Sequence, residues 1–164
     1  MSKLYDVIIV GAGPAGIFTA LELTRNRPDL KILIIEKGRE LGKRVCEARE
    51  RNAPCFNCSP CSTICGWGGA GAFSDGKLTL STEVGGSLEQ YISEKHLAEL
   101  IDYIDRIYTD FGAPGQVYGL ENEEEIEDMK RRAVLAELKL VPVRIRHMGT
   151  GRCKDVLQQM NDHL

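Results

Sequence analysis

The opening stretch of the chain constrains its fold more strongly than any other part of the sequence. Four consecutive apolar residues, 7–10, predict a short buried strand, which runs directly into the pattern G-x-G-x-x-G at Gly11, Gly13 and Gly16. Between a strand and a helix this pattern is typical of a dinucleotide-binding turn. Its glycines permit the tight turn, a close approach of the pyrophosphate, and close packing of helix on strand. The residues expected to form this site are Gly11, Gly13, Pro14, Ala15 and Gly16.

The next two elements complete the expected unit. The sequence predicts a helix over residues 14–26 and a second strand over residues 31–36, which together give a parallel βαβ unit. Glu36 ends the second strand, 20 residues after Gly16, where a carboxylate binds the ribose of a dinucleotide. Because a carboxylate repels a 2′-phosphate, we expect NAD or FAD here rather than NADP. An ordinary βαβ unit that binds no nucleotide is the alternative.

Composition excludes several other classes of protein. The chain has 164 residues, which suits one domain, and its net charge of −3 gives no reason to expect a nucleic acid or an anionic membrane surface as partner. No apolar run approaches the ~18 residues of a membrane span. The first residues lack the pattern of a signal peptide, so we expect a cytoplasmic protein.

A long segment without periodicity, residues 37–76, follows the second strand and is rich in glycine, cysteine and proline. Loops of this length inside a compact domain are usually functional. Five glycines fall within residues 66–76, which we call the glycine-rich segment. Successive N–H groups in glycine turns can bind anions, so this segment is a second candidate for contact with a phosphate.

The same long segment contains a cysteine run with the spacing C-x2-C-x2-C-x3-C at Cys55, Cys58, Cys61 and Cys65. This is the spacing of bacterial ferredoxin loops, and it predicts a [4Fe-4S] cluster, with Cys46 as a further candidate ligand. Three alternatives stay open. They are a tetrahedral zinc site, redox-active thiols at Cys58 and Cys61, and cysteines without a special role in a reducing compartment.

The second half of the chain is expected to be mostly helical. Apolar periodicity predicts a helix over residues 87–110, with a break near Ser93, and another over residues 122–138. Further short elements are a strand at residues 77–80, a strand at residues 140–146 and a helix that begins after Thr150. The sequence predicts no third parallel strand, so we expect the chain to be the N-terminal portion of a longer protein.

The nucleotide motif resembles that of the two-dinucleotide-binding-domain flavoproteins. Residues 11–16 read G-A-G-P-A-G, and Glu36 is followed by Lys37 and by further basic residues up to Arg44. The resemblance implies that the turn binds the ADP half of FAD. It also implies that Lys37 lies at the site and that a basic residue approaches the phosphates, for which Arg44 is the candidate. An exposed loop arginine is the alternative for Arg44.

A second resemblance involves the glycine-rich segment. Residues 68–77 read G-G-A-G-A-F-S-D-G-K and residues 146–150 read R-H-M-G-T. Both are similar to motifs of an uncharacterised family of FAD-dependent dehydrogenases, related more distantly to geranylgeranyl-reductase-type flavoproteins. Gly151 stands where that family carries an aspartate, which removes any role of that side chain here. The resemblance implies that these residues lie beside the flavin or its pyrophosphate: Gly68, Gly69, Ala70, Gly71, Ser74 and Asp75. Ser74 and Asp75 are equally suited to stabilising their own turn.

Together these observations predict an α/β fold, with an incomplete Rossmann-like, FAD/NAD(P)-binding βαβ unit and additional helices. The expected organisation is a nucleotide motif at 1–36, a cofactor loop at 37–80, a helical insertion at 87–139, and a strand and helix at 140–164. We expect the FAD-binding N-terminal region of a flavin-dependent oxidoreductase, with NAD(P)H or an iron–sulfur centre as electron donor. A non-catalytic fragment and a small metal-binding or electron-carrier module are the alternatives. The sequence assigns neither a catalytic residue nor a substrate.

Overall fold

A computed structural model describes residues 4–164 of the chain, which form two compact units. The first unit contains the residues up to Gly76 together with Thr150–Leu164, and the second contains Lys77–Gly149. Among the described residues, no helix combines the length and the apolar composition that crossing a membrane requires.

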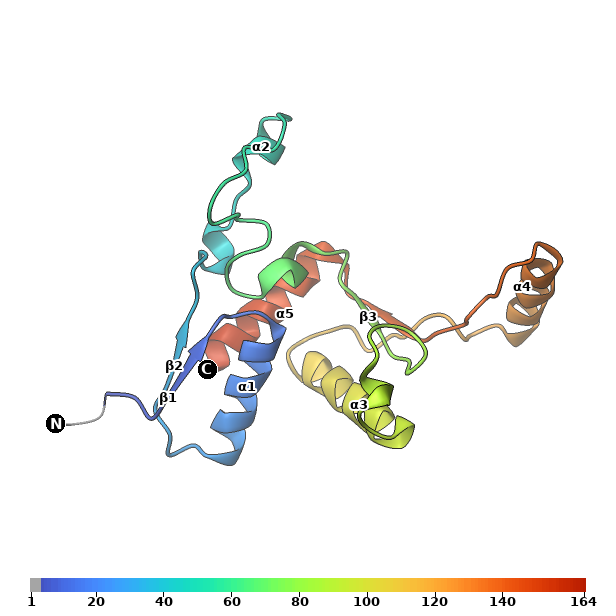
Figure 1. The fold of residues 1–164 in the computed structure, drawn as a ribbon, viewed down its shortest axis with the longest axis horizontal. Helices are drawn as coiled ribbons and strands as arrows, with labels where there is room; N and C mark the ends of the chain where they lie inside the picture. Colours follow the sequence, from blue (N-terminus) through green and yellow to red (C-terminus); the bar gives the residue numbers. More distant parts are fainter. Residues whose placement is uncertain (1–3) are drawn as a thin grey trace. The chain divides into compact units, whose positions relative to one another are not determined.

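The first unit is built on the predicted strand, helix and strand (Figure 1). Strand β1 spans Val7–Val10, helix α1 spans Pro14–Asn26, and strand β2 spans Ile32–Ile35. The two strands pair in parallel over their whole length. Parallel neighbours require a crossover connection, which α1 provides. The mixed α/β character that the sequence predicts is therefore confirmed, with a sheet of two strands in this unit.

Close packing between α1 and β1 depends on Gly16. A Cβ atom at this position would lie 2.0 Å from the carbonyl oxygen of Gly11 and 3.3 Å from the side chain of Ile9. No side chain fits there unless the helix moves away from the strand. Gly16 therefore has the packing role that its place in the motif predicts.

Helix α5, Gly149–His163, completes the first unit and begins slightly earlier than the predicted start after Thr150. Its apolar side chains are buried: Cys153, Val156, Leu157 and Met160. The helix packs on the glycine-rich segment, where the indole N–H of Trp67 donates to the carbonyl oxygen of Leu157 at 2.8 Å. The other elements of this unit are 3₁₀ helices at Leu41–Lys43 and Gly69–Phe73 and the short helix α2 at Glu47–Glu50.

The second unit combines two helices with a two-stranded antiparallel sheet. Its elements are strand β3 (Lys77–Thr79), a 3₁₀ helix (Leu88–Gln90), helix α3 (Glu94–Asp110), helix α4 (Glu123–Leu135) and strand β4 (Ile145–His147). The predicted break near Ser93 is confirmed, because the Ser93 hydroxyl accepts the N–H of His96 at 3.3 Å and caps α3. The side chain of Asn122 caps α4 in the same way.

Two boundaries in this unit differ from the prediction. Strand β4 covers residues 145–147 instead of 140–146, because Pro142 has no N–H to donate to a sheet. Helix α4 ends at Leu135 rather than near residue 138. Just beyond it, Glu137 has a φ of 58°, a left-handed conformation that does not continue a helix.

Arg146 anchors β4 to α3. Its side chain is buried, and its Nε and Nη2 atoms donate to the carboxylate of Asp105 at 2.6 and 2.7 Å. These charge-assisted bonds raise the pKa of Arg146. Nη1 also donates to the carbonyl oxygen of Pro114, so one buried side chain ties together three parts of the second unit.

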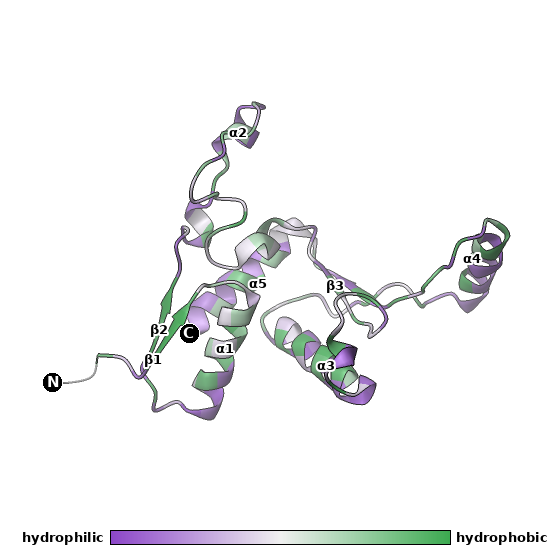
Figure 2. Ribbon diagram, in the orientation of Figure 1, coloured by the Kyte–Doolittle hydropathy of each residue, from purple (hydrophilic) through white to green (hydrophobic). Residues whose placement is uncertain are grey.

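One face of the parallel sheet is left open by the described residues. Ile8 is 58% exposed and Val10 is 83% exposed, whereas Ile9 faces α1. Figure 2 shows both strands as apolar along their length. Parallel sheets are normally covered on both faces, so β1 and β2 have the composition of interior strands.

The division of the chain that the sequence suggests, at residues 1–36, 37–80, 87–139 and 140–164, stays a prediction.

We predict that Gly16→Ala will destabilise the first unit, whereas Gly42→Ala will not. The new Cβ at position 16 meets backbone at 2.0 Å, and overpacking of this kind costs at least ~2 kcal/mol. A Cβ at Gly42 meets nothing within 4 Å, so the change there should stay within about 1 kcal/mol. Urea unfolding followed by circular dichroism measures both, and equal midpoints for the two variants would contradict the packing role of Gly16.

Candidate dinucleotide-binding site

The turn between β1 and α1 has the geometry of an anion-binding site. Gly11 follows β1 with a φ of 103°, which residues with a side chain rarely adopt, and its N–H donates to the carbonyl oxygen of Ile35 at 2.7 Å. Gly13 precedes α1 in an extended conformation, and a Cβ atom there would meet no atom within 4 Å. Open space therefore lies at the start of α1, where the helix N–H groups and the positive end of the helix dipole favour a phosphate.

Glu36 follows β2 and binds the same turn. Its Oε2 atom accepts the N–H of Ala12 at 2.8 Å, and its Oε1 atom accepts the N–H groups of Gly38 at 2.8 Å and Gly66 at 3.0 Å. These bonds, with that from Ala12 contributing most, hold the pKa of the Glu36 carboxyl below its ordinary value. An ionised carboxylate accepts about four hydrogen bonds, so capacity remains for a ribose hydroxyl.

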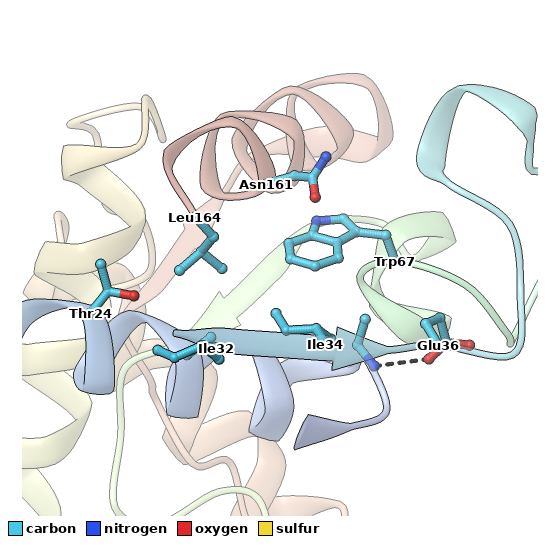
Figure 3. Close-up of a pocket in the computed structure, with 9 residues that line it drawn as sticks. Thr24, Ile32, Ile34, Glu36, Trp67, Asn161 and Leu164 are labelled. Carbon is cyan, nitrogen blue, oxygen red and sulfur yellow. Dashed lines mark hydrogen bonds between the residues drawn. The ribbon is translucent and has the colours of Figure 1, made fainter. Parts of the chain in front are cut away.

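A cavity of about 300 Å³ opens beside this carboxylate (Figure 3). Ile32 and Ile34 of β2 form one wall, and Trp67 and Leu164 lie across from them. The other lining residues are Ala12, Ala20, Thr24, Glu36 and Asn161. The cavity thus lies between α1, β2 and α5, and the Ala12–Glu36 hydrogen bond links it to the glycine turn.

The glycine-rich segment reaches the same turn although it is far away in sequence. The N–H of Gly68 donates to the carbonyl oxygen of Ala12 at 2.8 Å. A Cβ atom on Gly69 would lie 3.4 Å from the Cα atom of Gly13. The two glycine patterns therefore meet backbone to backbone. The sequence predicted that both glycine patterns lie at a cofactor, but it did not predict the hydrogen bond from Gly66 to Glu36. The high density of glycines in residues 66–76 was the only feature of the sequence that pointed to such a contact.

The other predicted contact residues lie around this centre. Pro14 and Ala15 form the exposed start of α1, and Lys37, Ala70, Gly71 and Asp75 are also exposed. The Ser74 hydroxyl donates to the carbonyl oxygen of Gly71 at 2.8 Å and accepts the N–H of Gly76 at 3.3 Å. Ser74 therefore stabilises its own turn, as the structural alternative predicts. Contact of these residues with a cofactor stays a prediction.

Arg44 is buried, so its interpretation as an exposed loop arginine is wrong. Its guanidinium donates to the carbonyl oxygens of Ser62 at 3.0 Å, Thr63 at 2.8 Å and Trp67 at 2.6 Å. It also lies 4.7 Å from the ring centre of Phe73. Each guanidinium nitrogen thus already has a carbonyl partner, and this arrangement gives no support to the predicted phosphate contact. Arg44 instead holds the end of the cysteine run in place.

The predicted metal ligands do not converge in the structure. Cys55, Cys58, Cys61 and Cys65 line the wall of a second cavity of about 270 Å³, together with Cys46. None of the six cysteines forms a disulfide. Within residues 4–164, no group of three or more His, Cys, Asp or Glu side chains is arranged to hold a metal ion. The arrangement of the described residues therefore does not fit an iron–sulfur cluster or a tetrahedral zinc ion, either of which needs several of these side chains to meet at one position.

Comparisons with known proteins cover mainly the nucleotide motif. The pattern of the Thi4 family matches residues 3–44. Thioredoxin reductase of Listeria monocytogenes is 49% identical over 55 residues, which is 34% of this chain and 17% of that protein. A probable electron transfer flavoprotein-ubiquinone oxidoreductase of Acinetobacter baylyi is 44% identical over 46 residues, which is 25% of this chain and 8% of that protein.

A longer match reaches the second half of the chain. Digeranylgeranylglycerophospholipid reductase of Methanococcus vannielii is 30% identical over 132 residues, which is 76% of this chain and 33% of that protein. The chain therefore spans a third or less of the length of each of these relatives. The resemblance to flavoproteins, including the geranylgeranyl-reductase type, is confirmed. Over the part that these matches cover, the chain is similar to FAD-dependent oxidoreductases.

Proposed function

We propose that this chain forms the N-terminal, FAD-binding region of a flavin-dependent oxidoreductase, with a Rossmann-like βαβ unit at its centre. The observation that carries the proposal is the open space at Gly13, between the start of α1 and the segment held by Glu36. When bound, the flavin supplies the hydride or electron chemistry. The residues of this chain bind and orient the ADP half of the cofactor.

Each part of the site has a separate role in this proposal. Gly13 and the first turn of α1 bind the pyrophosphate, since the backbone N–H groups and the helix dipole balance its charge. The carboxylate of Glu36 accepts a ribose hydroxyl, and its negative charge disfavours a 2′-phosphate. Gly68 and Gly69 add a second stretch of backbone close to the pyrophosphate, where a side chain would obstruct the cofactor.

The remaining parts of the proposal concern the whole protein. The catalytic residues and the substrate region belong to a remainder of the chain beyond these 164 residues, in keeping with the short matched share of each relative. NAD(P)H as electron donor and a cytoplasmic location rest on the sequence alone. An iron–sulfur centre forms no part of the proposal, because the cysteines do not fit one.

Binding of FAD to the purified chain tests the proposal directly. We expect FAD fluorescence to change on binding and ADP to compete, because the site recognises the ADP half. FMN lacks that half and should not bind, and 2′,5′-ADP should compete more weakly than ADP because of Glu36. A chain that is folded by circular dichroism but binds neither FAD nor ADP would favour the non-catalytic fragment.

We predict that Gly13→Ala will weaken FAD binding without destabilising the protein. The new methyl group meets nothing in the structure and the backbone conformation suits alanine, so the urea midpoint should not fall. The same methyl group would occupy the space that the pyrophosphate needs, and the Kd for FAD should rise ~10-fold or more. Fluorescence titration measures the Kd, and an unchanged value would contradict the role of Gly13.

We predict that Glu36→Gln will lower stability and flatten its dependence on acid pH. The amide replaces one oxygen acceptor by an NH₂ group that faces a backbone N–H, which costs about 1–3 kcal/mol at pH 7. In the wild type the folded pKa lies below the ordinary value of about 4.5. The stabilisation is therefore complete above pH 4.5 and is lost as the pH falls through the folded pKa. Urea unfolding between pH 3 and pH 7 tests this, and an equal pH slope in both proteins would contradict it.

A further inference from the structure

Helix α4 of the second unit ends in a cluster of exposed apolar side chains. None of its 13 residues is buried among the residues that the structure describes. Val134 is 70% exposed, Leu135 is 86% exposed, and Leu138, just after the helix, is 67% exposed. Single exposed apolar residues are common on protein surfaces, whereas a group of them marks an interaction surface. We call Val134, Leu135 and Leu138 the α4 tip.

The backbone holds the α4 tip in one conformation. The N–H of Leu138 donates to the carbonyl oxygen of Ala133 at 2.8 Å, and the N–H of Glu137 donates to that of Val134 at 3.0 Å. These two bonds form a Schellman motif, in which Glu137, with its φ of 58°, takes the left-handed position that glycine usually occupies. Because the reversal of the chain is already fixed, the α4 tip loses little conformational freedom when it binds a partner.

The apolar side chains of the α4 tip do not share one face. Val134 and Leu135 are consecutive, so they project about 100° apart around the helix axis, and Leu138 lies beyond the end of the helix. A helix that docks into a protein groove instead uses apolar residues at i, i+3, i+4 and i+7. Side chains that project in several directions from one helix end suit a fluid apolar medium, because it adapts to their shape.

Basic residues surround the α4 tip. Residues 129–140 contain four basic side chains and one acidic side chain, that of Glu137. The basic ones are Lys130, which pairs with Glu127 at 2.7 Å, and the exposed Arg131, Arg132 and Lys139. A negatively charged partner at the α4 tip therefore meets an excess of positive charge.

The acidic residues of α4 gather at its other end. Residues 123–128 contain five of them. At 1.5 Å per residue, the middle of this acidic stretch lies about 15 Å along the helix from Leu135, which exceeds the Debye length of ~8 Å at physiological salt. An anionic surface that meets the helix end-on is therefore attracted by the basic residues and screened from the acidic ones.

We propose that the α4 tip binds the surface of a bilayer that contains anionic phospholipids. Its three apolar side chains enter the boundary between head groups and acyl chains, and Arg131, Arg132 and Lys139 contact the lipid phosphates. The net charge of −3 does not oppose this binding, because positive and negative charges are separated along α4. The proposed nucleotide site lies in the first unit, so bilayer binding does not depend on FAD.

Co-sedimentation of the full 164-residue chain with vesicles tests the proposal. The vesicles contain phosphatidylcholine and phosphatidylglycerol in equal parts, with pure phosphatidylcholine as the reference. Wild-type protein should bind the anionic vesicles at least ~10-fold more tightly than the reference, and added salt should weaken this binding. The double variant Leu135→Gln/Leu138→Gln should bind at least ~10-fold more weakly, because it loses apolar contact with the bilayer. Leu88→Gln is the matched control, since Leu88 is also exposed in the second unit, and it should bind like the wild type.

A second pair of variants tests the charge. Arg131→Gln should weaken binding to the anionic vesicles ~5-fold, because one basic residue near an anionic surface contributes about 1 kcal/mol. Lys95→Gln removes a positive charge from the exposed surface of α3, away from the α4 tip, and should leave the affinity unchanged. Circular dichroism of each variant separates loss of binding from loss of fold.

Four results would overturn the proposal. The first is a folded wild-type chain that binds neither kind of vesicle. The second is equal affinity for both kinds of vesicle, and the third is an equal loss in Leu88→Gln and in the double variant. The fourth is a dimer in analytical ultracentrifugation that dissociates in the double variant and does not bind vesicles, which would make the α4 tip a contact between two copies of the chain.

Discussion

The three hydrogen bonds of the Glu36 carboxylate hold the first unit together at the place where a nucleotide would bind. They join the turn after β1, the residues after β2 and the glycine-rich segment through Ala12, Gly38 and Gly66. Hydrogen bonds to a charged group are worth about 1.5–3 kcal/mol each, so this one side chain fixes the relative positions of three segments. The carboxylate that the motif assigns to a ribose thus also holds together the segments around the proposed ribose site.

Features that depend on local sequence were predictable. The apolar run before Gly11, the helix that starts at Pro14, the break near Ser93 and the helix that starts after Asn122 all lie where the sequence indicates. Two predictions were wrong. The strand predicted over residues 140–146 is shorter because Pro142 cannot donate to a sheet, and helix α4 ends at Leu135 rather than near residue 138. Both errors lie at element boundaries, where one residue without an N–H or with a left-handed conformation outweighs the hydrophobic pattern.

Features that depend on distant backbone atoms were not predictable. Arg44 binds carbonyl oxygens 18 to 23 residues further along the chain, and Glu36 binds an N–H group 30 residues away. Every residue has a carbonyl and almost every residue has an N–H, so such partners leave no mark in the sequence. The sequence therefore predicted that Arg44 contacts phosphates. In the structure its guanidinium instead binds carbonyl oxygens at the end of the cysteine run. The spacing of the cysteines predicted their proximity but not how their sulfur atoms are arranged.

The segment at residues 61–67 connects the Glu36 carboxylate with the cavity that the cysteines line. Its first residue, Cys61, begins the turn that Arg44 holds, and Gly66 at the end of that turn donates to Glu36. Arg44 also binds the carbonyl oxygen of Trp67, so the turn is fixed at both of its ends by one buried cation. A covalent change at Cys61 that displaced this turn would alter the bond between Gly66 and Glu36. Linkage is reciprocal, so a ligand that strengthened that bond would change the energy of the Cys61 thiol by the same amount.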